Sequence, residues 1–229
     1  MSFKAIACEN AAKTLIPKFE KRGMAAYYCA TKEEAGKKVL ELMPKGSSVT
    51  WGGSESMVEA GVIDAVKSGE YEVIDRHAAK TPEESRAVYG KMVCADFHLM
   101  STNAFTKEGM LVNIDGASNR VACLAYGPKN VIVLASMNKM CEDVEAAVKR
   151  IRSQACPPNA VRVGAKTPCA QTGVCADCLS PDCICDQIMI TRMSRVKGRI
   201  MDSQHRAGSR TVAPRWSRAT CFNASRPLR

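Results

Sequence analysis

The stretch DFHLMSTNAFTKEGMLVNIDGASNRVACLAYGPKNVIVLA, residues 96–135, alternates short apolar runs with turns of small polar residues. The runs at 97–100 and 130–135 have the length and composition of buried β-strands. Between them, residues 104–106 and 110–114 are joined by Lys107-Glu108-Gly109, and this pattern predicts an antiparallel hairpin. We expect the rest of the chain to fold around these strands.

Polar side chains collect where these predicted strands end. Residues 97–100 run into Ser101-Thr102-Asn103, and the hairpin ends in the turn DGASNR at 115–120. An α/β protein builds ligand sites from small polar residues at strand ends. We therefore take Asp115 and Asn103 as candidate catalytic residues, and as candidate ligand-binding residues Thr102, Asn113, Gly116, Asn119 and Arg120.

This polar corner has two interpretations. Asp115 could orient a hydroxyl or act as a base, while Arg120 could bind a carboxylate or phosphate through two hydrogen bonds. Alternatively, Asp115-Gly116 is ordinary turn chemistry and Arg120 is paired inside the protein. The ligand site is the favoured interpretation because two separate strand ends converge in polar residues.

A second candidate for anion binding is the glycine pair after a predicted strand at 48–51. Gly52, Gly53 and Ser54 stand between that strand and a predicted helix at 55–67. This order aims backbone N–H groups at an anion, and glycine lets a ligand approach the backbone. A tight turn with an N-capping serine is the alternative. The glycine spacing fits neither a Walker nor a Rossmann motif, and the chain shows no NAD or flavin motif.

Helices and strands alternate along most of the chain. Further strands are predicted at 24–29 and 71–75, and helices at 3–22, 31–43, 81–93 and 140–153. The helical segments place apolar residues three and four positions apart, and two of them begin with capping-box residues. The alternation predicts an α/β fold whose mainly parallel sheet is covered by helices on both faces, with the 104–114 hairpin as its one antiparallel part.

Five cysteines crowd into one short segment, namely Cys169, Cys175, Cys178, Cys183 and Cys185. In a chain without an export signal, this density points to a metal or an iron–sulfur cluster rather than to disulfides. The most economical ligand set is Cys169, Cys175, Cys178 and Cys185. Thiolate ligation fits zinc or a cluster, and the spacing does not decide between them. Reduced unligated cysteines and a redox-active thiol pair are the alternatives.

Composition narrows the classes of function. The 229 residues are 46% hydrophobic, which suits a globular protein, and no run reaches the roughly 18 apolar residues of a membrane span. The first residues lack a signal-peptide core, so a cytoplasmic location is expected. Cysteines outside the segment, Cys156 among them, are predicted to be small buried hydrophobes.

The net charge of +10 is unevenly distributed. Residues 201–229 contain six Arg and one Asp, so about half of the excess lies in the last part of the chain. The body has no basic patch interleaved with aromatic residues, and we expect neither nucleic acid nor a membrane as a partner.

The segments TWGGSES, EVIDR, ADFHLMSTNAFTKEGMLVNIDGASNRVA and YGPKNVIVLASMNKM together resemble the lactate-utilisation (LUD) domain family. The resemblance covers about residues 1–199 and is greatest to the short, cysteine-tailed branch, in which four of the five clustered cysteines match and Cys183 is a local extra. It implies a three-layer α/β fold similar to sugar-phosphate isomerases, CoA transferases and formyltetrahydrofolate cyclo-ligases. For some relatives it also implies a part in oxidising lactate to pyruvate beside iron–sulfur partner proteins. It carries over no agreed catalytic residues.

The chain departs from that family after about Ile200, where relatives tend to finish with a hydrophobic strand. Residues 200–229 are rich in Arg, Ser and Pro and lack apolar periodicity, so they are expected to be disordered. We therefore predict residues 1–160 as a LUD-like α/β domain and 161–199 as a Cys-rich metal or cluster segment with a terminal strand. Residues 200–229 are predicted to be an atypical basic tail.

Together these observations favour a cytoplasmic protein of lactate or small organic-acid utilisation. Its anionic ligand would lie between residues 52–54 and the polar corner, and it would work with an iron–sulfur redox protein. A homo-oligomer is left open. The alternatives are an acyl/CoA- or folate-type transferase or ligase, and a non-enzymatic accessory subunit.

Overall fold

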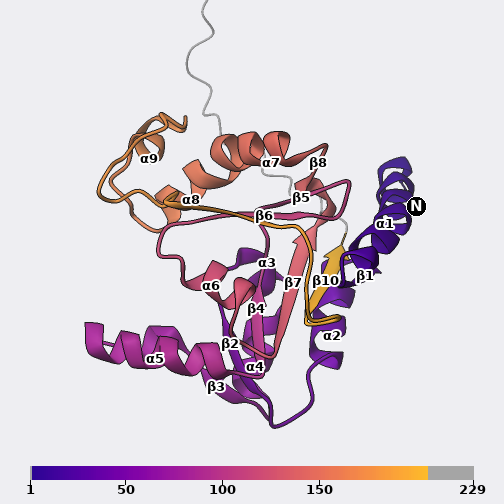
Figure 1. The fold of residues 1–229 in the computed structure, drawn as a ribbon, viewed down its shortest axis with the longest axis horizontal. Coiled ribbons are helices and arrows are strands. Elements are labelled where there is room, and N and C mark those ends of the chain that lie inside the picture. The colour runs from indigo at the N-terminus through magenta and orange to yellow at the C-terminus, as the bar shows by residue number, and fades with distance from the viewer. Residues whose placement is uncertain (1, 206–229) are drawn as a thin grey trace, which may run out of the picture.

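Two sheets form the frame of the molecule in this computed structural model, which describes residues 2–205 (Figure 1). The larger sheet has six strands, and every neighbouring pair is parallel. Its spatial order is β1 (Ala25–Cys29), β10 (Ile200–His205), β7 (Asn130–Ser136), β4 (Phe97–Met100), β2 (Ser48–Trp51) and β3 (Glu72–Ile74).

The predicted hairpin belongs to a second sheet rather than to the first. Its order is β8 (Met140–Cys141), β5 (Ala104–Thr106), β6 (Leu111–Asp115) and β9 (Gln187–Thr191). Strand β6 pairs antiparallel with both β5 and β9, while β5 and β8 run parallel. The expectation of a single antiparallel excursion is therefore wrong, because β9 returns from far along the chain to extend the hairpin.

Helices cover both faces of the larger sheet. On one face, α2 (Lys32–Glu41), α3 (Glu55–Glu59) and α4 (Val62–Ser68) pack on Leu99, Ile132 and Leu134. On the other face, α1 (Phe3–Lys21), α6 (Asn119–Ala125) and the second sheet pack on Val131 and Val133. Alternate residues of β7 thus enter opposite cores, as a strand buried on both faces requires. The predicted α/β fold with a mainly parallel, doubly covered sheet is confirmed.

The outer face of the second sheet has a helical cover of its own. Helix α7 (Val144–Arg150) continues through a π-helical turn (Ile151–Ala155) into α8 (Cys156–Arg162). These segments bury apolar side chains of β5 and β6. The helix predicted at 140–153 therefore starts later and ends later than expected, because β8 precedes it and Asp143 caps it through the backbone N–H of Ala146 at 2.8 Å.

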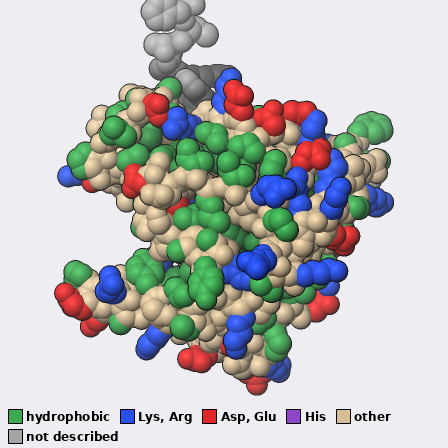
Figure 2. All heavy atoms as spheres, in the orientation of Figure 1, with side chains coloured by type: hydrophobic (Ala, Val, Ile, Leu, Met, Phe, Trp, Pro, Cys, Tyr) green, Lys and Arg blue, Asp and Glu red, His purple; other side chains and the backbone are tan. Residues whose placement is uncertain are grey.

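Other helix boundaries also follow local chemistry. Helix α5 (Pro82–Cys94) begins at the predicted capping box of Thr81 and Glu84. The helix predicted at 55–67 is divided into α3 and α4, because Gly61 adopts a left-handed backbone with φ of 70°. In Figure 2, α5 projects from the body, and the surface is hollowed between α5 and the part that carries α8 and α9 (Pro168–Thr172). No helix within residues 2–205 is long and apolar enough to cross a membrane.

The end of the described chain corrects the predicted tail. Residues 200–205 form β10, which lies between β1 and β7 in the larger sheet. The tail therefore does not begin at residue 200, and its remainder, 206–229, lies outside the described residues. The Cys-rich segment is likewise an insertion between α8 and β9, since β9 and β10 return to the two sheets.

Replacing Ile200 tests the correction. Ile200 is 2% exposed in the core between α1 and the sheet, so Ile200→Ala should lower the free energy of unfolding by about 2–5 kcal/mol in urea titrations. Val196→Ala, at a side chain that is 62% exposed, should change it by less than about 0.5 kcal/mol. Equal stabilities of the two variants would contradict the placement of β10.

Candidate functional site

Polar residues meet at the carboxyl edge of the larger sheet, where open parallel sheets bind ligands. The loops after β2 and β4 both end there, and the 3-10 turn η2 (Met137–Lys139) follows β7 at the same edge. The backbone of Gly52 donates to the carbonyl of Leu99 at 3.0 Å. A β-carbon on Gly52 would lie only 3.1 Å from Cδ of Arg120. The structure thus brings the glycine loop and the predicted polar corner into contact.

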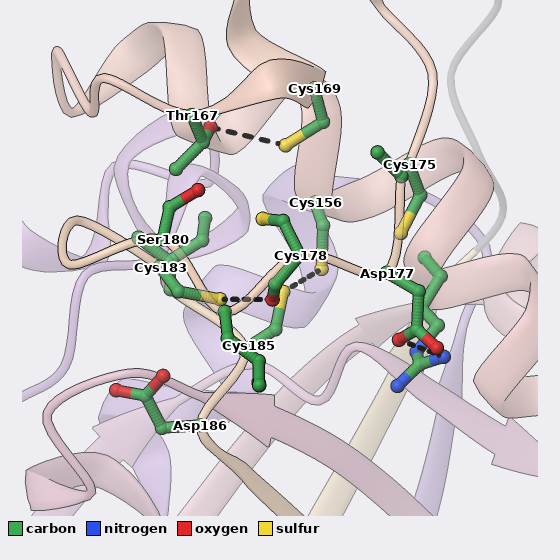
Figure 3. A pocket seen from close by; sticks show the side chains of 14 residues that line it. Cys156, Thr167, Cys169, Cys175, Asp177, Cys178, Ser180, Cys183, Cys185 and Asp186 are labelled. Carbon is green, nitrogen blue, oxygen red and sulfur yellow. Dashed lines mark hydrogen bonds and ion pairs between the residues drawn. The ribbon is translucent and has the colours of Figure 1, made fainter.

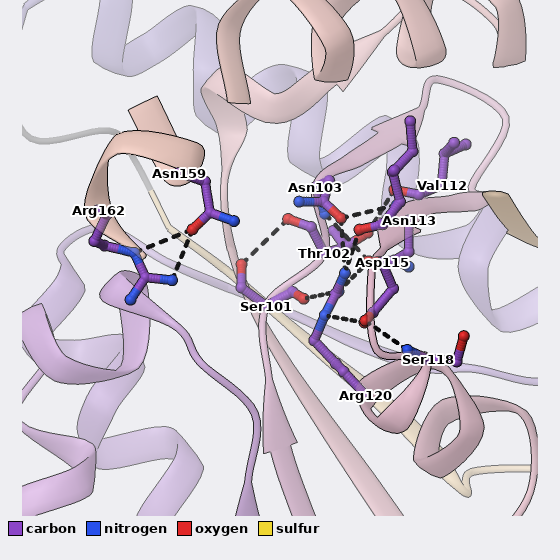
Figure 4. A network of polar contacts seen from close by, with 11 residues as sticks. Ser101, Thr102, Asn103, Val112, Asn113, Asp115, Ser118, Arg120, Asn159 and Arg162 are labelled. Atoms are coloured by element: carbon purple, nitrogen blue, oxygen red, sulfur yellow. Dashed lines mark hydrogen bonds and ion pairs between the residues drawn. The ribbon is translucent and has the colours of Figure 1, made fainter. Parts of the chain in front are cut away.

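Arg120 is the centre of the polar corner (Figure 4). Its Nη1 donates to Asn113 Oδ1 at 2.6 Å and to the carbonyl of Ser101 at 3.1 Å. Its Nη2 donates at 2.9 Å both to Asn103 Oδ1 and to the carbonyl of Ile114. Its Nε lies 3.1 Å from Oδ2 of Asp115, and the two side chains are 12% and 9% exposed.

These contacts use all five N–H groups of the guanidinium. Arg120 therefore has no donor left for a ligand in this conformation, and the geometry matches the internally paired alternative. Burial lowers the pKa of Arg120, and the charge of Asp115 opposes that shift. The other carboxylate oxygen of Asp115 accepts from the backbone N–H of Ser118 at 3.0 Å.

The remaining predicted residues of the corner mostly form hydrogen bonds within the corner. The hydroxyl of Thr102 donates to the carbonyl of Ala104 at 2.8 Å, and Asn103 Oδ1 also accepts from the N–H of Ile114 at 3.1 Å. The side-chain Nδ2 atoms of Asn113 and Asn119 are buried and have no partner among the residues described. These two amides are buried donors of the predicted set that the protein leaves unused.

Gly116 has a packing role. A β-carbon there would lie 2.9 Å from Cα of Ile184, which belongs to the Cys-rich segment. Real β-carbons essentially never approach so closely, so glycine allows the segment to pack directly on the turn after β6.

The glycine loop faces two further arginines. Ser54 caps α3 by accepting from the N–H of Met57 at 3.3 Å, as the turn interpretation expects. A β-carbon on Gly53 would lie 3.4 Å from Nη2 of Arg76 and 3.6 Å from Nη2 of Arg162. The pattern of the sequence did not single out either arginine, because they come from a 3-10 turn and a helix end that only the fold brings to Gly53.

Lys139 and Asp202 form a second polar group at this edge. Lys139 Nζ donates to Ser101 Oγ at 2.7 Å and to the carbonyl of Thr102 at 3.1 Å, and burial lowers its pKa to about 8. Asp202 is fully buried in β10, and burial raises its pKa to about 7. Its Oδ2 accepts from Gln204 at 2.9 Å, while Oδ1 has no partner within residues 2–205. Both groups therefore titrate near neutral pH.

His98 lies fully buried in β4, next to Thr50 of β2. Neither ring nitrogen of His98 has a partner in the described chain, and the hydroxyl of Thr50 has none either. Burial lowers the pKa of His98 to about 3, and the charges of Arg120, Arg76 and Arg199 add to that effect. The imidazole is therefore neutral at physiological pH.

The four predicted metal ligands share one cavity of about 310 Å³ with Cys156 and Cys183 (Figure 3). Within residues 2–205, no group of three or more His, Cys, Asp or Glu is arranged to hold a metal ion. Metal binding at these cysteines stays a prediction.

The LUD domain model matches residues 12–201. The chain belongs to the LUD domain family. Among solved structures it is similar to a DUF162 family protein from Deinococcus radiodurans, at 13% identity over 90% of this chain and 99% of that chain, with a TM-score of 0.48. No curated protein matches.

Two more distant structures cover about three fifths of this LUD domain protein. They are eIF2B delta from Chaetomium thermophilum, at 15% identity over 61% of this chain and 54% of that one, and ribose 5-phosphate isomerase A from Methanocaldococcus jannaschii, at 15% identity over 58% and 62%. Both TM-scores are 0.33.

Substituting Arg120 tests its role in the fold. Arg120→Ala leaves a buried carboxylate and two amide oxygens without their donor, so we expect a loss of about 3–5 kcal/mol in the free energy of unfolding. Arg120→Lys keeps the charge but not the planar fork and should still lose about 1–3 kcal/mol. The exposed Arg86 provides a control, Arg86→Ala, with a change under about 0.5 kcal/mol. Wild-type stability of Arg120→Ala would contradict the assignment.

The pH dependence of stability tests the burial of Asp202. Between its unfolded pKa of about 3.9 and its folded pKa of about 7, the folded state keeps a proton that the unfolded state releases. The contribution of Asp202 to stability therefore falls as pH rises through that range. Asp202→Asn removes the fall, so its advantage over wild type should grow by on the order of 4 kcal/mol between about pH 4 and pH 8.

Urea titrations of both proteins at several pH values give this difference directly. Asp64→Asn, at an exposed carboxylate, is the control and should follow wild type in parallel. Parallel profiles for Asp202→Asn and wild type would show that Asp202 has an ordinary pKa.

Proposed function

We propose that this LUD domain protein binds a small organic acid and that the acid's carboxylate lies at Gly53, between Arg76 and Arg162. The glycine loop of the sequence-based site is kept. The residues assigned to bind the anion are different, however. Arg120 is replaced in this role, because all of its donors are used, by two arginines that still have free N–H groups. The unpaired guanidinium of Arg76 is the observation that carries the proposal.

Arg76 has the features of a residue that binds an anion. It opens the 3-10 turn η1 (Arg76–Ala78), which Asp75 caps by accepting from the N–H of His77 at 2.9 Å. Its Nε is buried without a hydrogen bond, and no ion pair joins Arg76 to any residue within 2–205. A buried donor without an acceptor costs free energy, so binding of an acceptor would recover that loss.

Arg162 is only partly neutralised. Its Nε and Nη2 donate to Asn159 Oδ1 at 3.1 and 2.7 Å, and its Nη1 lies 3.4 Å from Glu55 Oε1. Figure 4 shows Arg162 and Asn159 on α8, across from Ser101. Two guanidinium groups that meet at one glycine repel each other. An anion between them would replace that repulsion with charge-assisted hydrogen bonds, and a carboxylate matches the guanidinium fork.

The site continues from the glycine loop toward Lys139. The stem of Arg120 touches Gly52, its head binds the carbonyl of Ser101, and Lys139 binds the hydroxyl of Ser101. Lys139 and Asp202 titrate near neutral pH, which suits groups that exchange a proton with a substrate. A 2-hydroxy or 2-oxo acid has both a carboxylate, which the arginines can bind, and a second oxygen, with which a group that titrates near neutral pH can exchange a proton. Lactate and pyruvate are the simplest examples, and they agree with a lactate-utilisation-related role.

The predicted catalytic pair has a different part in this proposal. Asp115 and Asn103 hold Arg120 in place, so they position the wall of the site rather than touch the acid. An iron–sulfur redox partner, which the family resemblance implies, is not required for this binding step and stays a prediction.

Isothermal titration calorimetry with lactate and pyruvate tests the proposal. Wild type should bind at least one of the two acids in a saturable manner. Arg76→Ala removes charge-assisted hydrogen bonds worth about 1.5–3 kcal/mol and should weaken binding by about 10–100-fold.

Arg86→Ala is the matched control, because it removes an exposed arginine from α5 and should bind as wild type does. Acetate, which has the carboxylate alone, should bind more weakly than the better of the two acids. Absence of binding to wild type, or equal affinity of Arg76→Ala, would refute the site.

A further inference from the structure

Six cysteine side chains line one cavity of about 310 Å³ (Figure 3). Five come from the Cys-rich segment and the sixth comes from the first turn of α8. The set is Cys156, Cys169, Cys175, Cys178, Cys183 and Cys185. A group of thiols this large around one space is the donor set of a thiophilic metal centre.

Cys156 is the member that the sequence pattern did not reveal. It is 6% exposed, and its Sγ lies 3.3 Å from Sγ of Cys185. It also lies within electrostatic range of Cys169, Cys175 and Cys183. The π-helical turn before α8 and the two prolines after Cys156 set the position of this residue. Its side chain therefore faces the segment cysteines rather than an apolar core alone.

The spacing of Cys156 and Cys185 is close to that of two ligands of one metal ion. Two thiolates on a tetrahedral ion, with metal–sulfur bonds of about 2.3 Å, lie about 3.8 Å apart. The observed pair at 3.3 Å needs only a small opening to reach that distance. The two residues lie far apart in the chain, so their approach is a product of the fold.

The remaining thiols distinguish a cluster from a single zinc ion. A structural zinc ion takes four ligands and fills the space between them. Here six thiols line one cavity of about 310 Å³, which is more ligands than a single zinc ion takes. Iron–sulfur clusters combine cysteine ligation with bridging sulfides that occupy such a space.

The cavity offers little other than thiols for ligation. The carboxylate of Asp177, which also lines it, is paired with Arg152 at 2.8 Å. No histidine lines the cavity. Cysteine-only ligation is the usual arrangement for both two-iron and four-iron clusters.

We infer that this cavity is the site of an iron–sulfur cluster and that Cys156 and Cys185 are two of its ligands. The inference is independent of organic-acid binding at Gly53, since it rests on the cysteines alone. Two of the four remaining thiols complete the ligand set, and the Cys175-x-x-Cys178 turn supplies the adjacent pair that clusters often use.

Anaerobic reconstitution of the full chain with ferric iron and sulfide, which supply the oxidation states of an oxidised cluster, tests the inference. Because the spacing of Cys156 and Cys185 fits two ligands on one iron, we expect a two-iron cluster, with about two iron and two acid-labile sulfide per chain and broad visible absorption. One zinc ion per chain after expression, with no uptake of sulfide, would overturn it.

Variants test the role of Cys156. Cys156→Ala and Cys185→Ala should each lower bound iron and visible absorbance at least about fivefold, because each removes one ligand. Cys123→Ala is the matched control, since Cys123 is also buried but lies in α6 outside the cavity. Circular dichroism confirms that each variant is folded, and Cys156→Ser, which keeps the side-chain volume, decides the matter if Cys156→Ala does not fold. Wild-type iron content in a folded Cys156 variant would overturn the assignment of Cys156.

Discussion

The buried guanidinium of Arg120 fixes the loop after β4 against strand β6. It binds the end of β4 through Ser101, the start of β5 through Asn103 and the strand β6 through Asn113 and Ile114. Taking a charge out of water is costly, and the cost is offset only when every donor finds an acceptor. Because all five donors do, the second sheet is fixed over the carboxyl edge of the first. The residue thereby shapes the candidate site without binding a ligand itself.

That constraint also accounts for the glycine pair. The stem of Arg120 occupies the space where a side chain of residue 52 would project. The next glycine leaves room for the guanidinium groups of Arg76 and Arg162. One buried arginine and two unsaturated ones therefore share the loop after β2. These arginines differ in their hydrogen bonds, because within residues 2–205 only Arg120 has an acceptor for every donor.

Local chemistry explains why much of the fold was predictable from the sequence. The period of the apolar residues, the capping box at Thr81 and the Lys107-Glu108-Gly109 turn act over a few residues, and the corresponding elements are present. The polar corner was also found, because its members are near one another in the chain. Whether Arg120 binds a ligand or the protein depends on how the loop after β4 and strand β6 fold around it, which the residue pattern does not show.

The wrong prediction for the end of the chain has one cause, which is burial of residues that usually lie at the surface. Asp202, Ser203 and Gln204 are buried in a central strand, so β10 looked like a polar tail. Consistency between levels of structure tends to fail at functional sites, and these residues fail it at the edge where parallel sheets bind ligands.

The cysteine cavity and the polar corner are physically joined. Gly116, directly after Asp115, lets Ile184 of the Cys-rich segment pack on the turn, and Cys156 lies within electrostatic range of Arg120. A change of charge in the cavity would therefore reach the guanidinium that fixes the corner, through protein of low dielectric rather than through water. Because Arg120 is bonded on all sides, it cannot move to relieve such a change. The electrostatic effect would pass on to the acceptors of Arg120 at Ser101 and Asn103, which lie beside Lys139 at the proposed ligand site.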